Sequence, residues 1–217
     1  MIPAARGYGG SGRPGGRPDD VTEVPVREQA RHDPAATAAQ PSPTLVRLVL
    51  FDRDGTLVHD VPYNGDPAKV RPLGDAVDAV TRLRSAGLRT GVVTNQSGIA
   101  KGLITAADEL AVRARVVELF GPFDTWQTCP HDAGDGCACR KPAPGMVLAA
   151  CAATGIPPEQ TVVIGDIGAD VRAAGAAGAR SVLVPTTATL AEEISGAEVR
   201  AATLREAADT VLTWAAP

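Results

Sequence analysis

The sequence predicts an α/β protein, a Rossmann-like three-layer α/β/α fold with a mainly parallel sheet, a zinc-binding loop and no large cap domain. From residue 45 onward, short apolar runs typical of strands alternate with stretches of helical periodicity. Strands that alternate with helices form parallel sheets through right-handed crossovers. The polar motifs follow one another closely, without room for a large insertion after Asp54 or between Thr94 and Lys141.

The first βαβ unit begins at residue 45. Residues 45–51 are a short apolar run, and we expect them to form a strand. Residues 74–86 carry apolar side chains three residues apart, a spacing that predicts a helix. Residues 88–94 are again mostly apolar and predict the second strand of the unit.

The remaining chain continues the alternation. Its expected elements, in chain order, are a helix over 106–120, a helix over 144–154, a strand over 161–165, a helix over 169–177, a strand over 181–185 and a closing helix over 204–214. Gly155 and Gly178 mark the ends of two of these helices. The segment after residue 120 holds closely spaced cysteines, and we expect it to be irregular.

Composition separates the chain into two parts and limits its partners. Residues 1–44 are rich in Gly, Pro and Arg and poor in apolar side chains, so we expect a disordered extension before one domain over 45–217. The net charge of −4 gives no attraction to nucleic acid or to acidic membranes. No run approaches the ~18 apolar residues that cross a bilayer, and the N-terminus lacks the apolar core of a secretory signal. We therefore expect a cytoplasmic monomer with a small-molecule partner.

Two acidic residues at the end of the first strand predict phosphoryl transfer. Asp52 and Asp54 follow directly on the apolar run, and active sites of open α/β sheets lie beyond the carboxyl ends of their strands. One carboxylate can attack phosphorus and the other can carry a proton, while a divalent cation offsets their repulsion. The alternative is a strand followed by an ordinary Asp-Gly turn.

Three further polar positions fit the same edge of the sheet. The segment 94–98 follows the second strand and offers a hydroxyl and backbone N–H groups to phosphate oxygens. Asp166 follows the strand over 161–165, with Asp170 one helical turn later. Lys141, one of only three lysines beside eighteen arginines, can place a compact charge on one phosphoryl oxygen. Each position alone also fits a turn, a helix cap or chance.

A cysteine and histidine cluster predicts structural zinc. Cys129, His131, Cys137 and Cys139 form a C-x-H-x5-C-x-C array, which supplies three thiolates and one imidazole for a tetrahedral ion. Disulfides are a poor alternative in a chain without a secretion signal. Four protein ligands leave no position for a catalytic water, so the metal is expected to be structural.

These motifs resemble the haloacid dehalogenase superfamily of phosphohydrolases. The residues that follow its motif order are Asp52, Asp54, Thr56, Thr94, Lys141, Asp166 and Asp170. More narrowly, the chain looks like the subfamily of D-glycero-D-manno-heptose 1,7-bisphosphate 7-phosphatases and histidinol-phosphate phosphatases, on the segments 51–57, 94–100, 129–131 and 137–146. The resemblance covers about residues 46–215.

The resemblance implies a role for each matching residue. Asp52 is implied as the nucleophile that forms an aspartyl-phosphate, and Asp54 as the acid that protonates the leaving oxygen and then activates water. Magnesium, the catalytic cofactor, is implied at Asp52, the backbone carbonyl of Asp54 and Asp166, with Asp170 in support. Thr94 and Lys141 are implied to bind the transferring phosphoryl group. The implied substrate-binding set is Asp60, Tyr63, Thr94, Asn95, Gln96, Ser97, Arg140 and Lys141, of which Arg140 is also counted among the catalytic residues.

Two positions differ from the heptose phosphatase pattern. Ile167 stands where those enzymes usually have a lysine after the acidic residue, and only five residues separate His131 from Cys137. The leading hypothesis is a magnesium-dependent phosphomonoesterase that removes the 7-phosphate of the heptose bisphosphate. The alternatives are a histidinol-phosphate phosphatase, a phosphatase for another small ester or for a nucleic-acid end, and a non-catalytic zinc-stabilised module.

Overall fold

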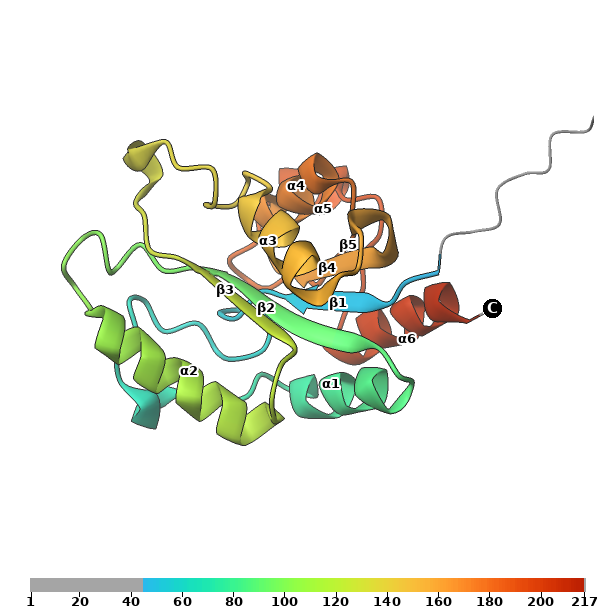
Figure 1. Ribbon diagram of the computed structural model, residues 1–217, viewed down its shortest axis with the longest axis horizontal. Helices are drawn as coiled ribbons and strands as arrows, with labels where there is room; N and C mark the ends of the chain where they lie inside the picture. Colours follow the sequence, from blue (N-terminus) through green and yellow to red (C-terminus); the bar gives the residue numbers. More distant parts are fainter. Residues whose placement is uncertain (1–44, 217) are drawn as a thin grey trace, which may run out of the picture. The chain divides into compact units, whose positions relative to one another are not determined.

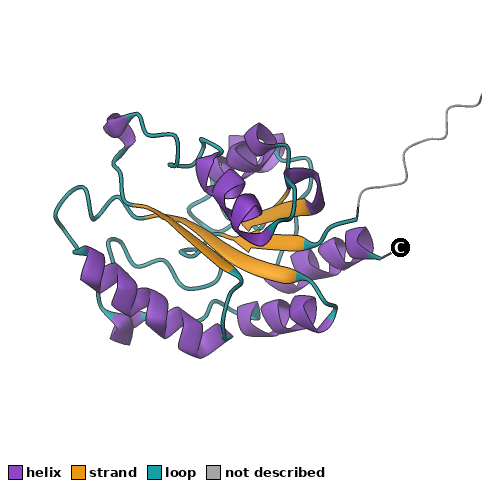
Figure 2. Cartoon of the chain, viewed as in Figure 1, coloured by secondary structure: helices purple, strands orange, loops and turns teal. Residues whose placement is uncertain are grey.

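The computed structural model describes residues 45–216, in which five parallel strands lie between two layers of helices (Figures 1 and 2). The strands are β1 (Leu48–Phe51), β2 (Arg89–Asn95), β3 (Thr125–Cys129), β4 (Thr161–Gly165) and β5 (Arg180–Leu183). The helices are α1 (Ala76–Ser85), α2 (Ala106–Phe120), α3 (Gly145–Thr154), α4 (Gly168–Ala177), α5 (Ala191–Gly196) and α6 (Leu204–Ala215). The extension predicted over residues 1–44 lies outside the described residues.

Strand order places the first strand in the middle of the sheet. The order is β3-β2-β1-β4-β5, and every neighbouring pair is parallel. Phe51, the last residue of β1, aligns with Val92 of β2 and Ile164 of β4. The loops that follow β1, β2 and β3 gather at the left of Figure 1, as expected where carboxyl ends of parallel strands meet.

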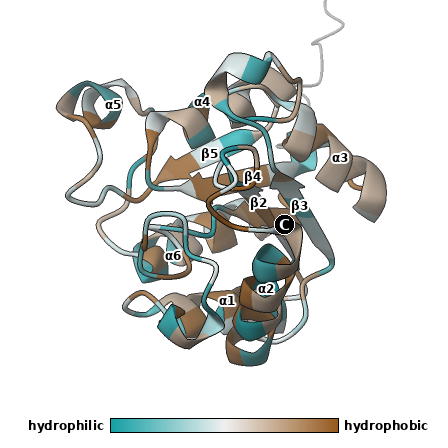
Figure 3. Ribbon diagram, turned by 90° about the vertical axis from the view of Figure 1, so that its left-hand side faces the viewer, coloured by the Kyte–Doolittle hydropathy of each residue, from teal (hydrophilic) through white to brown (hydrophobic). Residues whose placement is uncertain are grey.

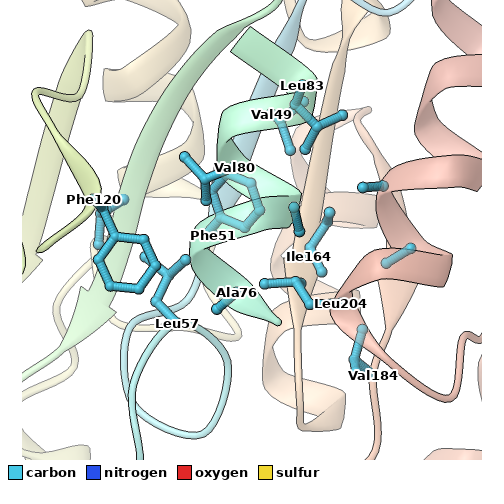
Figure 4. Packing of buried hydrophobic residues seen from close by; sticks show 14 of the residues in the cluster. Val49, Phe51, Leu57, Ala76, Val80, Leu83, Phe120, Ile164, Val184 and Leu204 are labelled. Carbon is cyan, nitrogen blue, oxygen red and sulfur yellow. The ribbon is translucent and has the colours of Figure 1, made fainter. Parts of the chain in front are cut away.

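Alternating side chains of the central strand build two separate cores. Val49 and Phe51 pack into the cluster formed with α1, α2 and α6, whereas Leu48 and Leu50 pack into the cluster formed with α3 and α4. Both pairs are fully buried, which a parallel strand covered on both faces requires. Figure 3 shows apolar strands between the helical layers, and Figure 4 shows Phe51 beside Val80 of α1.

The prediction of an irregular segment after residue 120 is wrong over residues 125–129, which form β3. The strand pairs with β2 along its whole length, yet only its first and last residues, Thr125 and Cys129, are buried. The strand mixes Trp126 with polar residues and contains no continuous apolar run, so its pairing with β2, and not a local pattern, makes it a strand. The short helix α5 was also not predicted.

The loops above the sheet contain no second domain within residues 45–216. Between β1 and α1, the only helical element is the 3-10 helix η1 (Pro67–Lys69). Two further 3-10 helices, η2 (Ala133–Asp135) and η3 (Pro158–Gln160), lie in later loops. Among the described helices, none combines the length and the apolar character that a bilayer crossing needs.

The packing of α1 generates a stability prediction. Leu83 is fully buried against the first cluster, so Leu83→Ala should lower the free energy of unfolding by about 2–5 kcal/mol through lost burial and a residual cavity. Val77 on the same helix is exposed, and Val77→Ala should change the free energy of unfolding by less than about 0.5 kcal/mol. Urea denaturation measures both. Equal losses would show that α1 does not pack by the face described.

Candidate active site

A cavity of about 360 Å³ lies beyond the carboxyl ends of β1, β2 and β4. Ten of the predicted site residues line it, namely Asp52, Asp54, Asp60, Tyr63, Thr94, Asn95, Gln96, Ser97, Arg140 and Asp166. Lys141 and Asp170 are more deeply buried, at 4% and 1% exposure, and do not line the cavity. The structure therefore brings together residues that are more than a hundred positions apart in the chain.

Lys141 is the charged centre beneath the cavity. Its Nζ donates to Oδ1 of Asp52 and to Oδ1 of Asp170, both at 2.6 Å, and to the backbone carbonyl of Val93 at 2.9 Å. All three ammonium protons thus have an acceptor, which a buried lysine requires. The contacts join the end of β1, the end of β2 and the first turn of α4.

Burial shapes the acid–base properties of this group. Desolvation and neighbouring carboxylates raise the pKa of Asp52 from 3.8 to about 8, although Lys141 opposes them. Desolvation, followed by repulsion from Asp170, raises the pKa of Asp166 to about 7. Burial alone would lower the pKa of Lys141, but the carboxylates of Asp170 and Asp52 outweigh it and raise the pKa above its ordinary value. A bound divalent cation would favour the charged carboxylates.

Three carboxylates form a candidate cation site. Oxygen atoms of Asp52, Asp166 and Asp170 lie within 4.8 Å of one another, and all three residues are buried. Gly55, with a φ of +82°, passes so close to the site that a Cβ there would lie 2.4 Å from Oδ2 of Asp166. The donors are hard oxygens, which fit magnesium. Asp170 is a member of this side-chain cluster, whereas the ligand predicted from Asp54 is its backbone carbonyl and its carboxylate makes other contacts.

The carboxylate of Asp54 turns toward nitrogen donors. Its Oδ2 accepts hydrogen bonds from Nη2 of Arg53 and from Nε2 of Gln96, each at 2.8 Å. The same amide nitrogen of Gln96 donates to Oγ1 of Thr94 at 2.9 Å. Gln96 therefore links the predicted proton carrier to the predicted phosphate-binding hydroxyl.

Asn95 lines the cavity but its side chain holds the backbone of Lys141. Its Nδ2 donates to the carbonyl oxygen of Lys141 at 3.2 Å, and its Oδ1 accepts from the N–H of Lys141 at 3.1 Å. Both polar atoms of the amide are thereby used within the protein. Asn95 therefore supports the backbone of Lys141, and the substrate contact that the resemblance implies for it stays a prediction.

The cavity mouth carries the remaining predicted substrate contacts. Tyr63 has a φ of +52°, rare for a residue with a side chain, and its hydroxyl accepts from Nζ of Lys101 at 2.9 Å. Desolvation, followed by the charge of Asp54, raises the pKa of Asp60. Arg140 donates from Nη1 to the carbonyl oxygen of His131 at 3.3 Å.

The cysteine and histidine cluster has the geometry of one tetrahedral site. Its four ligand atoms lie within 4.8 Å of one another, and the separations described in detail run from 3.2 Å to 3.7 Å. Zinc–sulfur bonds of about 2.3 Å imply tetrahedral edges near these values. The sulfur atoms are too far apart for disulfides, whose S–S bond is about 2.05 Å. The four ligands are Cys129, His131, Cys137 and Cys139.

Several cavity residues were not predicted as site residues. They are Arg53, Asn64, Ile167 and Ala188, together with Val61 and Pro62 between the predicted contacts Asp60 and Tyr63. Gly98 also lines the cavity and belongs to the predicted segment 94–98. A signal existed for Arg53, which stands between the two acids of the first motif, and Ile167 was singled out only as a departure from a pattern. Ala188 belongs to a loop without any polar motif, so the sequence offers no signal for it.

A larger cavity lies elsewhere in the domain. It measures about 660 Å³ and includes residues of β5, α4 and α6, such as Val171, Ser181 and Thr213. None of the predicted site residues lines it. The smaller cavity therefore remains the candidate active site because it holds the titratable groups with shifted pKa values.

The chain has close relatives among sugar phosphatases. A family model described as HAD-hydrolase-like matches residues 138–211. The chain is 39% identical over 146 residues to D-glycero-β-D-manno-heptose-1,7-bisphosphate 7-phosphatase of Pseudomonas putida, covering 65% of this chain and 83% of that protein. The corresponding protein of Pseudomonas aeruginosa is 37% identical over 144 residues, covering 64% of this chain and 81% of the relative.

A solved structure shares the fold. The crystal structure of the D,D-heptose 1,7-bisphosphate phosphatase of B. bronchiseptica, complexed with magnesium and phosphate, matches with a TM-score of 0.69 and 28% identity. The match covers 77% of this chain and 99% of that chain. The similarity thus extends over nearly the whole of that protein.

The lysine centre generates a second prediction. Lys141→Met leaves Asp52 and Asp170 buried without their cation and should lower the free energy of unfolding by about 3–5 kcal/mol at pH 8 in the presence of a chelator. Without the lysine, nothing opposes the desolvation that raises the folded-state pKa of Asp52 above its unfolded value. The variant therefore loses stability as pH rises through that folded-state pKa, and the deficit should shrink at pH 5.

Urea denaturation at the two pH values measures this effect. Lys69 is exposed, and the matched control Lys69→Met should leave the unfolding midpoint nearly unchanged at both. A Lys141→Met deficit that is the same at pH 5 and pH 8 would contradict the assignment of the loss to unpaired carboxylates.

Proposed function

The chain belongs to the haloacid dehalogenase-like hydrolase family and is a phosphatase of that family, and from this premise we propose that it removes the 7-phosphate of D-glycero-β-D-manno-heptose 1,7-bisphosphate. The observation that carries the proposal is the carboxylate of Asp52 at the base of the cavity, hydrogen-bonded to Lys141. The relatives named for this reaction support the choice of substrate.

The proposed mechanism proceeds through a phosphorylated aspartate. A carboxylate oxygen of Asp52 forms a bond to phosphorus while the bond from phosphorus to the ester oxygen breaks. Asp54 gives its proton to the departing sugar oxygen, and later takes a proton from the water that attacks phosphorus and releases Asp52. Lys141 and Thr94 are proposed to hold the oxygens of the transferring group, whose charge grows in the transition state.

Magnesium is the proposed catalytic cofactor. The ligands proposed for it are Asp52, Asp166 and the backbone carbonyl of Asp54, and the cluster of buried carboxylates supports this choice. The cation would neutralise charge on the phosphate and on Asp52. The ion pair between Asp170 and Lys141 at 2.6 Å supports a positioning role for Asp170.

Zinc is the proposed structural cofactor. The last of its four ligands in the chain is Cys139, and Arg140 and Lys141 follow directly. The metal would therefore hold in place the segment that carries these two basic side chains. Arg140 lines the cavity, and its guanidinium can grip a second phosphate or sugar hydroxyls through two parallel hydrogen bonds. Asp60, Tyr63 and Ser97 are proposed to contact the sugar from the cavity wall.

The proposed setting follows from the same features. We propose that residues 45–217 are the catalytic domain and that it acts as a monomer in the cytoplasm on a small phosphorylated sugar. The net charge of −4 supports a partner that is neither nucleic acid nor an acidic membrane.

A phosphate-release screen tests the proposed reaction. The substrates are D-glycero-β-D-manno-heptose 1,7-bisphosphate, histidinol phosphate and 3′-phosphorylated oligonucleotides, each with magnesium. We expect the heptose bisphosphate to have the highest kcat/KM, with the 1-phosphate left on the product. Asp52→Asn should reduce release to the background of the assay, because an amide does not attack phosphorus. A higher kcat/KM for either other substrate would contradict the heptose assignment, and activity in Asp52→Asn would contradict the nucleophile.

Elemental analysis tests the zinc assignment. Protein purified without chelators should contain about one zinc per chain, and Cys137→Ser should lose most of it because one thiolate is removed. The kcat/KM should fall as well, since Arg140 and Lys141 follow the cluster. Cys151 lies in α3 outside the cluster, and the matched control Cys151→Ser should keep the zinc. Absence of zinc from the unaltered protein would overturn this assignment.

A further inference from the structure

A buried chain of polar contacts leads from α2 and β3 to Asp54. Arg53 is 1% exposed, and its Nη1 lies 3.8 Å from Oε1 of Glu109 in α2. The same Oε1 accepts a hydrogen bond from Oγ1 of Thr128 at 3.1 Å, and that hydroxyl accepts one from Nε1 of Trp126, also at 3.1 Å. Helix α2, strand β3 and the loop after β1 thus meet in one line of contacts that ends at the proposed proton carrier.

Glu109 is a buried acidic side chain, and its charge requires a compensating partner. Its exposure is 5%, on a helix whose other described acidic side chains reach solvent or cap the helix end. The Nη1 of Arg53 has no hydrogen-bond partner among the described residues, and Glu109 is the carboxylate that faces it. Because a buried charge is stable only when it is paired, Glu109 compensates the guanidinium and holds it in place.

Arg53 in turn fixes the orientation of Asp54. The Oδ2 atom accepts from Nη2 of Arg53 at 2.8 Å, from Nε of Arg53 at 3.1 Å and from Gln96 at 2.8 Å. The Oδ1 atom has one longer contact, 3.2 Å from the same Nε. A carboxylate oxygen surrounded by N–H donors has little room for a proton, so Oδ1 is left to carry it.

We infer that Glu109 is a positioning residue for the acid–base step, which it serves by holding Arg53 so that Oδ1 of Asp54 exchanges the proton. This inference rests on the proposed role of Asp54. In the first half-reaction the Oδ1–H bond breaks and the proton passes to the ester oxygen as the P–O bond breaks. In the second, Oδ1 receives a proton from water as the water oxygen bonds to phosphorus and frees Asp52.

Two phosphate esters separate this role from a purely structural one. β-Glycerophosphate leaves as an alkoxide that needs a proton, whereas p-nitrophenyl phosphate leaves as a stable phenolate that needs none. In Glu109→Gln, the single-turnover rate with β-glycerophosphate should fall roughly tenfold to a hundredfold, a part of the ~10²–10⁴ that a general acid contributes. The first-turnover burst of p-nitrophenolate should change by less than about twofold, and KM should stay constant.

Matched variants complete the test. Glu118 is an exposed residue of the same helix, and Glu118→Gln should leave both rates unchanged. Glu109→Asp keeps the charge and should restore part of the rate lost with β-glycerophosphate. If circular dichroism shows that Glu109→Gln does not fold, Thr128→Val removes a hydrogen bond to the same carboxylate and should show the same dependence on the leaving group, at a few-fold loss.

The outcomes distinguish this inference from the proposed role of Asp54. Asp54→Asn should show a larger loss with β-glycerophosphate than with the p-nitrophenyl burst, and equal losses there would reject Asp54 as the acid. If Asp54→Asn behaves as expected while Glu109→Gln leaves both rates unchanged or lowers both equally, the positioning role of Glu109 is overturned.

Discussion

Pairing of Lys141 with two buried carboxylates is the interaction on which the site depends. The sheet buries Asp52 at the end of its central strand and Asp170 in the first turn of α4, so both charges lose most of their contact with water. The single ammonium group lies 2.6 Å from both and is also bound by the carbonyl of Val93. The proposed nucleophile is therefore held by the same contacts that join the ends of β1 and β2 to α4, so that the stability of the fold and the proposed reactivity depend on the same atoms.

The loop that carries Lys141 has little apolar surface of its own. It runs from β3 to α3 with only the 3-10 helix η2, and most of its residues are partly or fully exposed. Two sets of polar contacts hold it instead. One is the cluster of three cysteines and one histidine, and the other is the amide of Asn95, which pairs with both backbone groups of Lys141. A loop with little apolar packing can position a charged side chain accurately when several such polar contacts fix its backbone conformation.

The sequence predicted the elements and site residues that a local pattern encodes. The strands at β1 and β4 are continuous apolar runs, and an acidic residue follows each of them, so Asp52 and Asp166 were predictable neighbours. β3 was not predictable, because its residues form no continuous apolar run and its pairing with β2 supplies the missing stability. Glu109 was not predicted as a site residue for a related reason. In the sequence it resembles any acidic residue in the first turn of a helix, and it becomes buried only when β3 places Thr128 against it.

The distance along the chain between Asp52 and Lys141, 89 residues, has a consequence for synthesis. The ribosome completes β1, β2 and β3 before the ammonium group that neutralises Asp52 leaves the exit tunnel, and Asp170 follows later still. A nascent chain that ends before Lys141 also lacks β4, so β1 is an edge strand and the carboxylate of Asp52 has no cation beside it. Burying that carboxylate alone is unfavourable. The carboxylate of Asp52 therefore disfavours closure of the site until the segment that carries Lys141 has been translated.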